Sequence, residues 1–382
     1  MACCVGKKAQ CVMSSLVLVA SIAVMHYANQ TLLSSRCMSR YTNWLSLLSC
    51  NAVLGDRDMV AQVLRHVFSD KLSTKYQGIV QNLASKSPIP IRHFDFKFNP
   101  AELDEKFFLN KELATSYFHA LSIFLTFGED VVIETARHHR DFIEDPILKQ
   151  RLTSLIGQEA IHSKIHNQFN DEVLKENGYP VELLRAIAGK VFDYGIYKLP
   201  QSLQLSLMAG IEHYTAVLAE FMMQHEDYLL GSQDERQRAM WMWHMLEESE
   251  HKDIAYDVFL ALSGNYWLRI TGFLLASLTI LGGVSLGGYL MPFVRKPSNL
   301  VNPRYMKDIV ESTALLFGSE RGVFGSSFMH ILEYLRPSFH PNDHDTTAYM
   351  AYYKERLLNP ETGLLSPYFL KEFVPPVRAA SA

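Results

Sequence analysis

The sequence is poor in cysteine, and its cysteines are confined to one end of the chain. All five lie within the first fifty of 382 residues: Cys3, Cys4, Cys11, Cys37 and Cys50. The rest of the chain therefore has no disulfide framework, no thiolate metal site and no catalytic cysteine. Glycine and proline are also few, at 20 and 15 residues. No low-complexity tract or solenoid repeat occurs, which argues against a disordered chain and against a repeat architecture.

Charge of either sign is modest. Lysine and arginine number 36 and aspartate and glutamate 40, which gives a net charge of -4. Because there is no basic run, we expect no nucleic-acid partner. Hydrophobic residues make up 48% of the chain. This length and composition allow one large domain or two small ones, with a sizeable core.

Two uncharged apolar runs predict contact with a membrane. Residues 12–28 follow two lysines and fit an uncleaved anchor, so residues 1–30 form a predicted N-terminal hydrophobic anchor. Residues 270–294 carry no charge, and at ~1.5 Å per residue they span a hydrocarbon core of ~30 Å. We therefore expect 267–296 to be a transmembrane or membrane-embedded segment, of undetermined orientation, and the protein to localise to a membrane. A fully buried helix is the alternative for the second run.

Between these runs the pattern is helical and predicts an all-α fold. The periodicity of apolar residues predicts long helices at about 112–139, 146–176, 200–228 and 233–262. No strand–helix alternation occurs, which argues against a doubly wound sheet. The remaining divisions of the chain are a helical or linker region at 31–90, a four-helix bundle at 91–262 and a C-terminal helical tail at 299–382.

Glutamate and histidine interrupt the apolar faces of all four predicted helices. The first and third helices each carry a single acid within an apolar stripe, Glu129 and Glu212. The second and fourth each carry a Glu-x-x-His motif, namely Glu159-x-x-His162 and Glu248-x-x-His251. The i,i+3 spacing places the glutamate and the histidine on one face, about one turn apart. Taken singly, each motif is more often a surface pair, but the four helices together indicate a shared site.

Carboxylates buried together repel one another and lose their hydration unless cations neutralise them. A glutamate from each of two helices and a Glu-x-x-His from each of two others is the ligand set of ferritin-like di-iron and di-manganese bundles. We therefore predict a ferritin-like four-helix bundle with two bound metal ions, expected to be iron, with manganese or zinc as alternatives. The predicted ligands are Glu129, Glu159, His162, Glu212, His244, Glu248 and His251. His166 and Glu247 are predicted to support these ligands from behind, a role that the residues also leave open for His244.

Several segments resemble the motifs of the predicted metal-dependent hydrolase family, a ferritin-like group. They are FLTFGEDVV, GQEAIHSKIHNQFN, GIEHYTA, WMWHMLEESEHKDIAYDVF and the late YLRPSFHP. The resemblance extends over roughly residues 90–350 and implies a metal-dependent enzyme. The ligand order is also similar to that of the ribonucleotide reductase small subunit and the arylamine N-oxygenases. The N-oxygenases have a further histidine ligand four residues before the last Glu-x-x-His. This resemblance implies that His244, at the same spacing, is a ligand.

The leading functional prediction is a membrane-associated di-iron enzyme that uses O₂ to oxidise a lipophilic small molecule, with an electron donor protein as partner. The alternative is a metal-dependent hydrolase in which a metal-bound hydroxide attacks an ester, amide or phosphate. A serine hydrolase built on Gly283-x-Ser285-x-Gly287 is a weaker alternative, because a nucleophile elbow needs a strand before it and a helix after it. Metal storage without turnover is the last.

Overall fold

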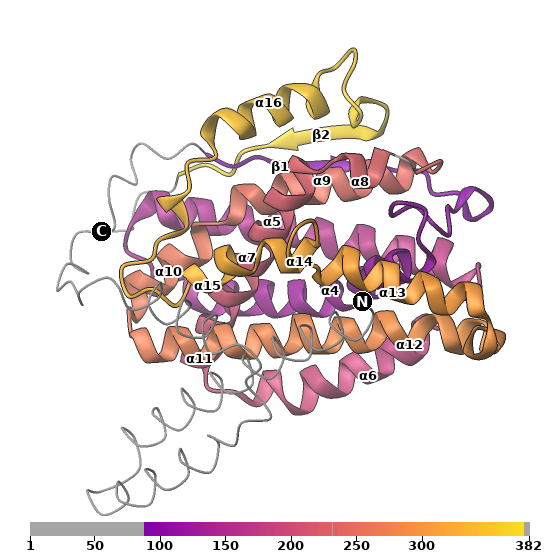
Figure 1. The fold of residues 1–382 in the computed structure, drawn as a ribbon. Helices are drawn as coiled ribbons and strands as arrows, with labels where there is room; N and C mark the ends of the chain where they lie inside the picture. The colour runs from indigo at the N-terminus through magenta and orange to yellow at the C-terminus, as the bar shows by residue number, and fades with distance from the viewer. Residues whose placement is uncertain (1–87, 231, 378–382) are drawn as a thin grey trace, which may run out of the picture.

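A computed structural model describes residues 88–230 and 232–377. The predicted anchor at 1–30, and almost all of the region at 31–90, lie outside these described residues. The described chain is mostly helical, with one pair of short strands, so the predicted all-α class is confirmed (Figure 1).

Four long helices make up the centre of the molecule. They are α4 (Glu112–Arg140), α5 (Pro146–Phe169), α7 (Gln201–Gln224) and α9 (Glu235–His251). Helix α4 packs against α5 and α7, and α9 packs against the same two helices. These four helices, called the four-helix group below, therefore enclose a common interior.

Local capping explains where two of these helices begin. Asp145 accepts hydrogen bonds from the backbone N–H groups of Ile147 and Leu148, and Pro146 occupies the first helical turn of α5. Asp234 caps α9 in the same way through the N–H groups of Arg236 and Gln237. The aspartate side chains satisfy backbone donors that have no partner within the helix.

The fourth predicted helix, 233–262, is in fact two helices. Helix α9 ends at His251, and α10 (Ile254–Leu262) begins after a short interruption. Both residues of the interruption have side chains bound elsewhere. The Asp253 carboxylate accepts a 2.9 Å hydrogen bond from Arg151, and the Lys252 ammonium donates to the backbone oxygen of His344. These tertiary contacts explain the break, which the helical periodicity does not show.

Two other predicted helices also differ near their ends. The second extends to Lys175, within a residue of its predicted end, but its last part, η4 (Asn170–Lys175), is a π-helix. The third ends at Gln224 and is followed by the short α8 (Asp227–Leu230). Asn170 exchanges hydrogen bonds with Ser122 on α4. The wider π turn therefore begins where the helix is tied to its neighbour.

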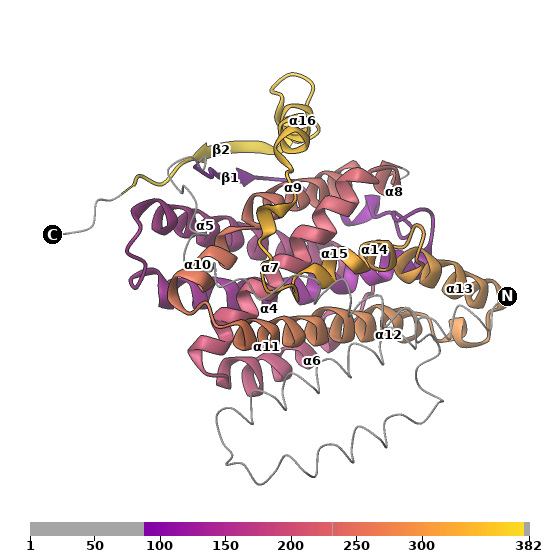
Figure 2. The same cartoon turned by 60° about the vertical axis from the view of Figure 1, so that its left-hand side comes forward.

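Residues 266–295 form one continuous helical run outside the four-helix group. It consists of α11 (Tyr266–Ser277), the π-helix η6 (Leu278–Val284) and α12 (Ser285–Arg295). Helix α11 packs along α7 and α12 along α4 (Figure 2). Among the described residues this is the one helix long and apolar enough to cross a membrane, and 56% of its most apolar window is buried. A buried core helix has the same properties, so the run does not by itself place the protein in a membrane.

The remaining helices cover the outside of the group. They are α6 (Val181–Tyr194), α13 (Pro303–Phe317), α14 (Val323–Ser326), α15 (Phe328–Glu333) and α16 (Thr347–Leu358), with short 3-10 turns at η3 (Pro100–Glu102), η5 (Ile196–Lys198), η7 (Pro297–Val301), η8 (Pro341–Asp343) and η9 (Ser366–Tyr368). Strand β1 (Ile91–Phe94) pairs antiparallel with β2 (Phe369–Phe373). The C-terminal tail therefore returns to the start of the described chain, above α9 in Figure 1.

Candidate metal centre

All seven predicted ligands are buried and come from the four-helix group. Glu129 lies on α4, Glu159 and His162 on α5, Glu212 on α7, and His244, Glu248 and His251 on α9. The structure brings them together in overlapping sets whose donor atoms lie within 4.8 Å of one another. The sets are Glu159, Glu212, Glu248 and His251; Glu129, Glu159 and His162; His162, His244 and Glu248; and Glu129, His166 and His244.

Two carboxylates occupy the middle of the cluster. His251 Nδ1 lies 2.8 Å from Glu159 Oε1 and 3.9 Å from Glu248 Oε2. His162 Nδ1 lies 3.8 Å from Glu159 Oε2 and 3.6 Å from Glu248 Oε1. Glu159 and Glu248 thus each present their two oxygens to different histidines. Each of these two carboxylates therefore offers an oxygen to either half of the cluster.

Among the described residues, the donor atoms that meet here make ion-pair contacts, such as that between His251 and Glu159, but no hydrogen bonds of normal geometry. Buried, unpaired atoms are found on six of the seven predicted ligands: Glu129 Oε1 and Oε2, Glu159 Oε1, His162 Nδ1, Glu212 Oε2, Glu248 Oε2 and His251 Nδ1. Leaving so many buried polar atoms unpaired is costly unless another group binds them. Oxygen and imidazole nitrogen donors aimed at one point fit divalent iron, manganese or zinc.

The outer nitrogens of the two motif histidines are held in place by neighbouring side chains. His162 Nε2 lies 3.0 Å from Glu247 Oε2, and His251 Nε2 lies 2.6 Å from Gln158 Oε1. An acceptor at Nε2 holds a proton on that nitrogen and turns Nδ1 toward the cluster, where a bound cation would displace the second proton and use the Nδ1 lone pair. Both histidines are thus oriented as metal ligands usually are.

A buried arginine connects these two supporting groups. Arg92, on β1, donates hydrogen bonds of 3.0 Å to Glu247 and 2.9 Å to Glu250. Gln158 in turn donates to Glu250 at 3.0 Å. Although burial alone would raise the pKa of Glu250, the Arg92 guanidinium lowers it to about 2. A continuous chain of hydrogen bonds therefore runs behind the ligands. It leads from His162 through Glu247, Arg92, Glu250 and Gln158 to His251.

His244 is held by a second chain of hydrogen bonds. Its Nδ1 lies 3.0 Å from His166 Nε2, and His166 Nδ1 lies 2.8 Å from the Ser122 hydroxyl. Its other nitrogen, Nε2, lies 3.2 Å from Glu248 Oε1. Burial and the neighbouring His162 lower the pKa of His244, which favours a neutral ring with a free lone pair. His244 therefore turns Nε2 toward the cluster, while His166 supports its other ring nitrogen.

Without bound cations, the negative charge of the clustered carboxylates has to be neutralised by protons. Burial and the charge of Glu159 raise the pKa of Glu129 well above its usual range and that of Glu212 to about 8. Burial acts in the opposite direction on His162, but Glu159 and Glu247 outweigh it and raise its pKa to about 10. Protons therefore neutralise these acids, and divalent cations would displace them. This charge requirement is a second sign that the cluster fits metal ions.

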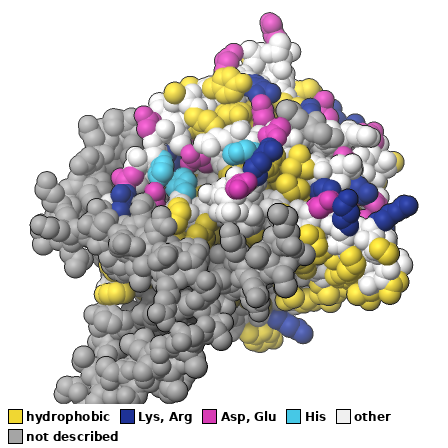
Figure 3. Space-filling model, in the orientation of Figure 1, with side chains coloured by type: hydrophobic (Ala, Val, Ile, Leu, Met, Phe, Trp, Pro, Cys, Tyr) yellow, Lys and Arg dark blue, Asp and Glu magenta, His cyan; other side chains and the backbone are white. Residues whose placement is uncertain are grey.

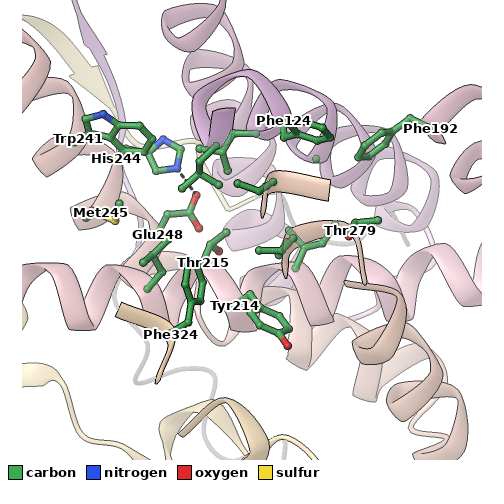
Figure 4. A pocket seen from close by; sticks show the side chains of 17 residues that line it. Phe124, Phe192, Tyr214, Thr215, Trp241, His244, Met245, Glu248, Thr279 and Phe324 are labelled. Atoms are coloured by element: carbon green, nitrogen blue, oxygen red, sulfur yellow. Dashed lines mark ion pairs between the residues drawn. The ribbon is translucent and has the colours of Figure 1, made fainter. Parts of the chain in front are cut away.

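An apolar pocket with a cavity volume of about 50 Å³ reaches the cluster. His244 and Glu248 stand at one end of it, beside Met245, while Phe192 and Thr279 lie at the other (Figure 4). Its walls come from α4, α6, α7, α9, α14 and the π-helix η6. The pocket gives an apolar molecule a place directly beside two of the predicted ligands.

Sequence reasoning missed part of this site. Arg92, Gln158 and Glu250 were not predicted as part of the site, although all three are buried. A weak signal exists for Arg92, which is a lone base within the alternating stretch PIPIRHFDF. Gln158 directly precedes the first motif glutamate. Neither position shows its partners without the tertiary structure.

The serine hydrolase alternative does not fit the structure. Ser285 begins α12 and follows the π-helix η6, within one helical run. The strand that a nucleophile elbow requires is therefore missing before it.

Comparison with known proteins gives one match. The family model described as "Predicted metal-dependent hydrolase" matches residues 90–345. No curated protein and no solved structure matches the chain. The match covers all seven predicted ligands and agrees with the range over which the sequence motifs showed their resemblance.

Proposed function

The chain belongs to the predicted metal-dependent hydrolase family, and from this premise we propose that it is an enzyme with a dinuclear metal centre in a ferritin-like four-helix bundle. The proposed ligands are Glu129, Glu159, His162, Glu212, His244, Glu248 and His251. The observation that carries this proposal is the set of buried, unpaired donor atoms on six of these residues.

Two metal positions are consistent with the overlapping donor sets. One position draws on Glu212 and His251, the other on Glu129, His162 and His244, and Glu159 and Glu248 belong to both. The bound ions would supply redox or Lewis-acid chemistry next to the pocket. The protein's own contribution is to fix the ligands through Glu247, Gln158 and His166, and to exclude water with the surrounding apolar core.

The proposed substrate is an apolar small molecule. The pocket is lined mainly by leucine, isoleucine, phenylalanine and other apolar side chains, with Thr215 and Thr279 among its few polar groups (Figure 4). Apolar walls with a few polar groups near a reactive centre are typical of small-molecule sites. A highly charged substrate would lose its hydration here without compensation.

For the reaction, we propose O₂-dependent oxidation on a di-iron centre. A glutamate from each of two helices and a Glu-x-x-His from each of two others is the ligand set of di-iron and di-manganese carboxylate proteins. Histidine and carboxylate ligands without thiolate suit iron and manganese. Oxidation requires an electron donor protein as partner. The proposal rests on the ligand types and their order along the four helices.

Hydrolysis is the second candidate, and the family's description favours it more directly. In this case the two metal ions would activate water for attack on an ester, amide or phosphate. The pocket restricts such a substrate to one whose bulk is apolar. Both reactions use the same ligands, so the metal centre alone does not separate them.

A metal exchange distinguishes the two reactions. We would purify the full chain, remove its metal, and reload matched samples with iron or zinc. Oxidation predicts that reduced iron-loaded protein consumes O₂ and gives a transient visible absorption, with a coupled di-iron signal by Mössbauer spectroscopy. If the zinc-loaded protein cleaves apolar esters or amides and the iron-loaded protein does not react with O₂, hydrolysis is the reaction and oxidation is disproved. Failure of Glu212→Gln to lower metal content would overturn both.

We further propose that the run 266–295 contacts a lipid bilayer. Leu278 and Leu286 are 64% and 60% exposed, and apolar side chains gather over the edge of the molecule where α12 and α13 lie (Figure 3). Residues of the same run, including Thr279 and Ile280, line the pocket. An apolar substrate could thus pass from lipid to the pocket along η6.

Flotation with lipid vesicles tests this contact. Leu278→Ser and Leu286→Ser together should reduce vesicle binding of the full chain. The matched control is Leu370→Ser, which removes a leucine of similar exposure from β2, on the other side of the molecule. Equal binding of the three proteins would argue against lipid contact by this run.

A further inference from the structure

A second group of metal-binding residue types lies outside the dinuclear centre. His330 and Glu333 are one turn apart on α15, and His344 follows the 3-10 turn η8. The i,i+3 spacing places the first two side chains on the same face of the helix. One donor atom from each of the three residues lies within 4.8 Å of the others.

The three side chains are already close to one another. His344 Nε2 lies 2.6 Å from Glu333 Oε2. The centres of the His330 and His344 rings are 4.0 Å apart, and their planes are tilted by 35°. The two imidazoles and the carboxylate would therefore need little rearrangement to bind one cation together.

The turn that carries His344 is braced by its own contacts. The backbone N–H of Asn342 donates to the His340 ring, and the backbone N–H of His340 donates to the Asp343 carboxylate. Lys252 donates a 2.7 Å hydrogen bond to the backbone oxygen of His344. These contacts hold the backbone at His344, and the hydrogen bond to Glu333 holds its ring.

A small hollow with a cavity volume of about 20 Å³ adjoins the cluster. His330 and His344 line it, together with Glu220, Ser249 and Lys252. Three protein ligands with a fourth position open to a hollow is the arrangement of exchangeable zinc sites, for which two histidines and one glutamate are a known ligand set. Glu220 contributes a carboxylate to the lining of the hollow, and Lys252 contributes an ammonium group.

The cluster lies behind the dinuclear centre, across α7 and α9. On α7, Glu212 belongs to the dinuclear centre, whereas its neighbour His213 lines the hollow. On α9, Glu248 belongs to the centre, whereas Ser249 lines the hollow. Successive residues of a helix point about 100° apart. The two clusters are thus on different faces of the same two helices.

We propose that His330, Glu333 and His344 form a second, separate metal site that binds one Zn²⁺ ion with an exchangeable position facing the hollow. The site is half-exposed, whereas the dinuclear centre is buried. Zinc held at this site is therefore accessible to chelators in solution, and ions in the dinuclear centre are released slowly. The proposal does not depend on the reaction at the dinuclear centre.

Zinc release from the full chain tests the proposal. Protein saturated with Zn²⁺ is mixed with an excess of a chromophoric chelator, and the released zinc is followed with time. We expect a fast phase that releases one equivalent of zinc from the second site, followed by a slow phase that releases zinc from the dinuclear centre. His344→Ala and Glu333→Gln should each abolish the fast phase, while the exposed His138→Ala, as matched histidine control, should keep it. Circular dichroism verifies that each variant remains folded.

A crossed variant separates this proposal from the proposed function. Glu212→Gln should diminish the slow phase and keep the fast one, because Glu212 belongs only to the dinuclear centre. If folded His344→Ala and Glu333→Gln release zinc with the same fast phase as the unchanged protein, the three residues are a hydrogen-bonded surface cluster and the second site is disproved. That result would leave the dinuclear centre unaffected.

Discussion

At the scale of single residues, the four central glutamates are not equivalent. Glu129 and Glu212 have raised pKa values, because they are buried near Glu159 and have few compensating contacts. The pKa of Glu159 is lowered instead, since close contacts with His162 and His251 outweigh its burial. Glu159 is therefore the ionised acid around which the metal-free cluster is organised, and Glu212 holds a proton.

This difference predicts opposite results for two identical substitutions. Glutamine resembles a protonated glutamate, so Glu212→Gln should change the unfolding free energy of the metal-free protein by less than about 1 kcal/mol. Glu159→Gln leaves His162 and His251 without their counter-ion and should cost about 3–5 kcal/mol. Both variants should bind less metal. Chemical denaturation of metal-free protein, with metal analysis of the loaded protein, measures the two effects; equal losses of stability would contradict the assigned charge states.

Arg92 gives a second prediction at this scale. Its side chain is 3% exposed, and it is the cation that pairs with both Glu247 and Glu250. Arg92→Gln removes the cation shared by two buried carboxylates and leaves Glu250 with Lys354 and Glu247 with His162 as partners. The loss should lower the unfolding free energy by up to about 3–5 kcal/mol. Arg185→Gln, which removes a surface ion pair with Asp171, serves as control and should cost no more than about 1 kcal/mol. A similar small loss for both would show that Arg92 is not needed to neutralise this layer.

The sequence predicted the ligands better than their supports, for a physical reason. Glu-x-x-His places two donors on one face of a helix, so Glu159 and His162 are visible as a pair in a single segment. Arg92 reaches its partners from a strand, at a distance of 155 residues from Glu247. No local period records such a contact, and any lone arginine in an alternating stretch would give the same signal.

At the scale of elements, the periodicity of apolar residues predicted that the helices exist, but it did not predict how they end. The first predicted helix, 112–139, agrees with α4 to within a residue. The break at Lys252 and Asp253 and the π turns from Asn170 depend on side chains that bind to other elements. Tertiary contacts of this kind override local propensity and do not appear in the pattern of apolar residues.

The packing of α11 on α7 gives a prediction about two glycines. A Cβ atom on Gly272 would overlap the backbone of Ser206, so the two helices touch at this point. On Gly282 the nearest atom is Leu278 Cδ1 at 3.6 Å, which is an ordinary contact. Gly272→Ala should therefore destabilise the protein by roughly 1–3 kcal/mol. Gly282→Ala should be neutral or add up to about 1 kcal/mol. Thermal unfolding distinguishes them, and equal midpoints would contradict the close approach.

At the scale of the whole molecule, segments that the sequence separated pack onto one another. The run 266–295 lies along α7 and α4, and the tail provides β2 as partner to β1. Strand pairing between distant segments depends on the tertiary surroundings, so the short alternating stretch near residue 91 did not identify its partner. The same burial explains why an uncharged run long enough for a membrane is also a plausible core helix. Its most apolar window is 56% buried, which lies between the burial expected of a lipid-exposed helix and that of a core helix.

Long-range ion pairs at the end of this run predict how stability depends on pH. Glu105, before α4, pairs with Arg295 and Lys296 at the end of α12. The hydrogen bond from Arg295, aided by Lys296 and opposed by burial, lowers the pKa of Glu105 from 4.5 to about 2. A lowered folded-state pKa stabilises the protein above the unfolded value, and this contribution is lost as the pH falls from 4.5 toward 2.

Glu105→Gln should therefore lower the thermal unfolding midpoint at pH 7, and the difference from the unchanged protein should shrink steadily between about pH 5 and pH 2. Because the pair is partly exposed, salt should also reduce the difference at pH 7. Glu361→Gln, at an exposed position near the C-terminal end, is the control and should leave the midpoint unchanged at each pH. If the unfolding midpoint of Glu105→Gln stays below that of the unchanged protein by the same amount down to pH 2, the Glu105 side chain stabilises the protein by packing. The ion pairs between α12 and the segment before α4 would then contribute no stability.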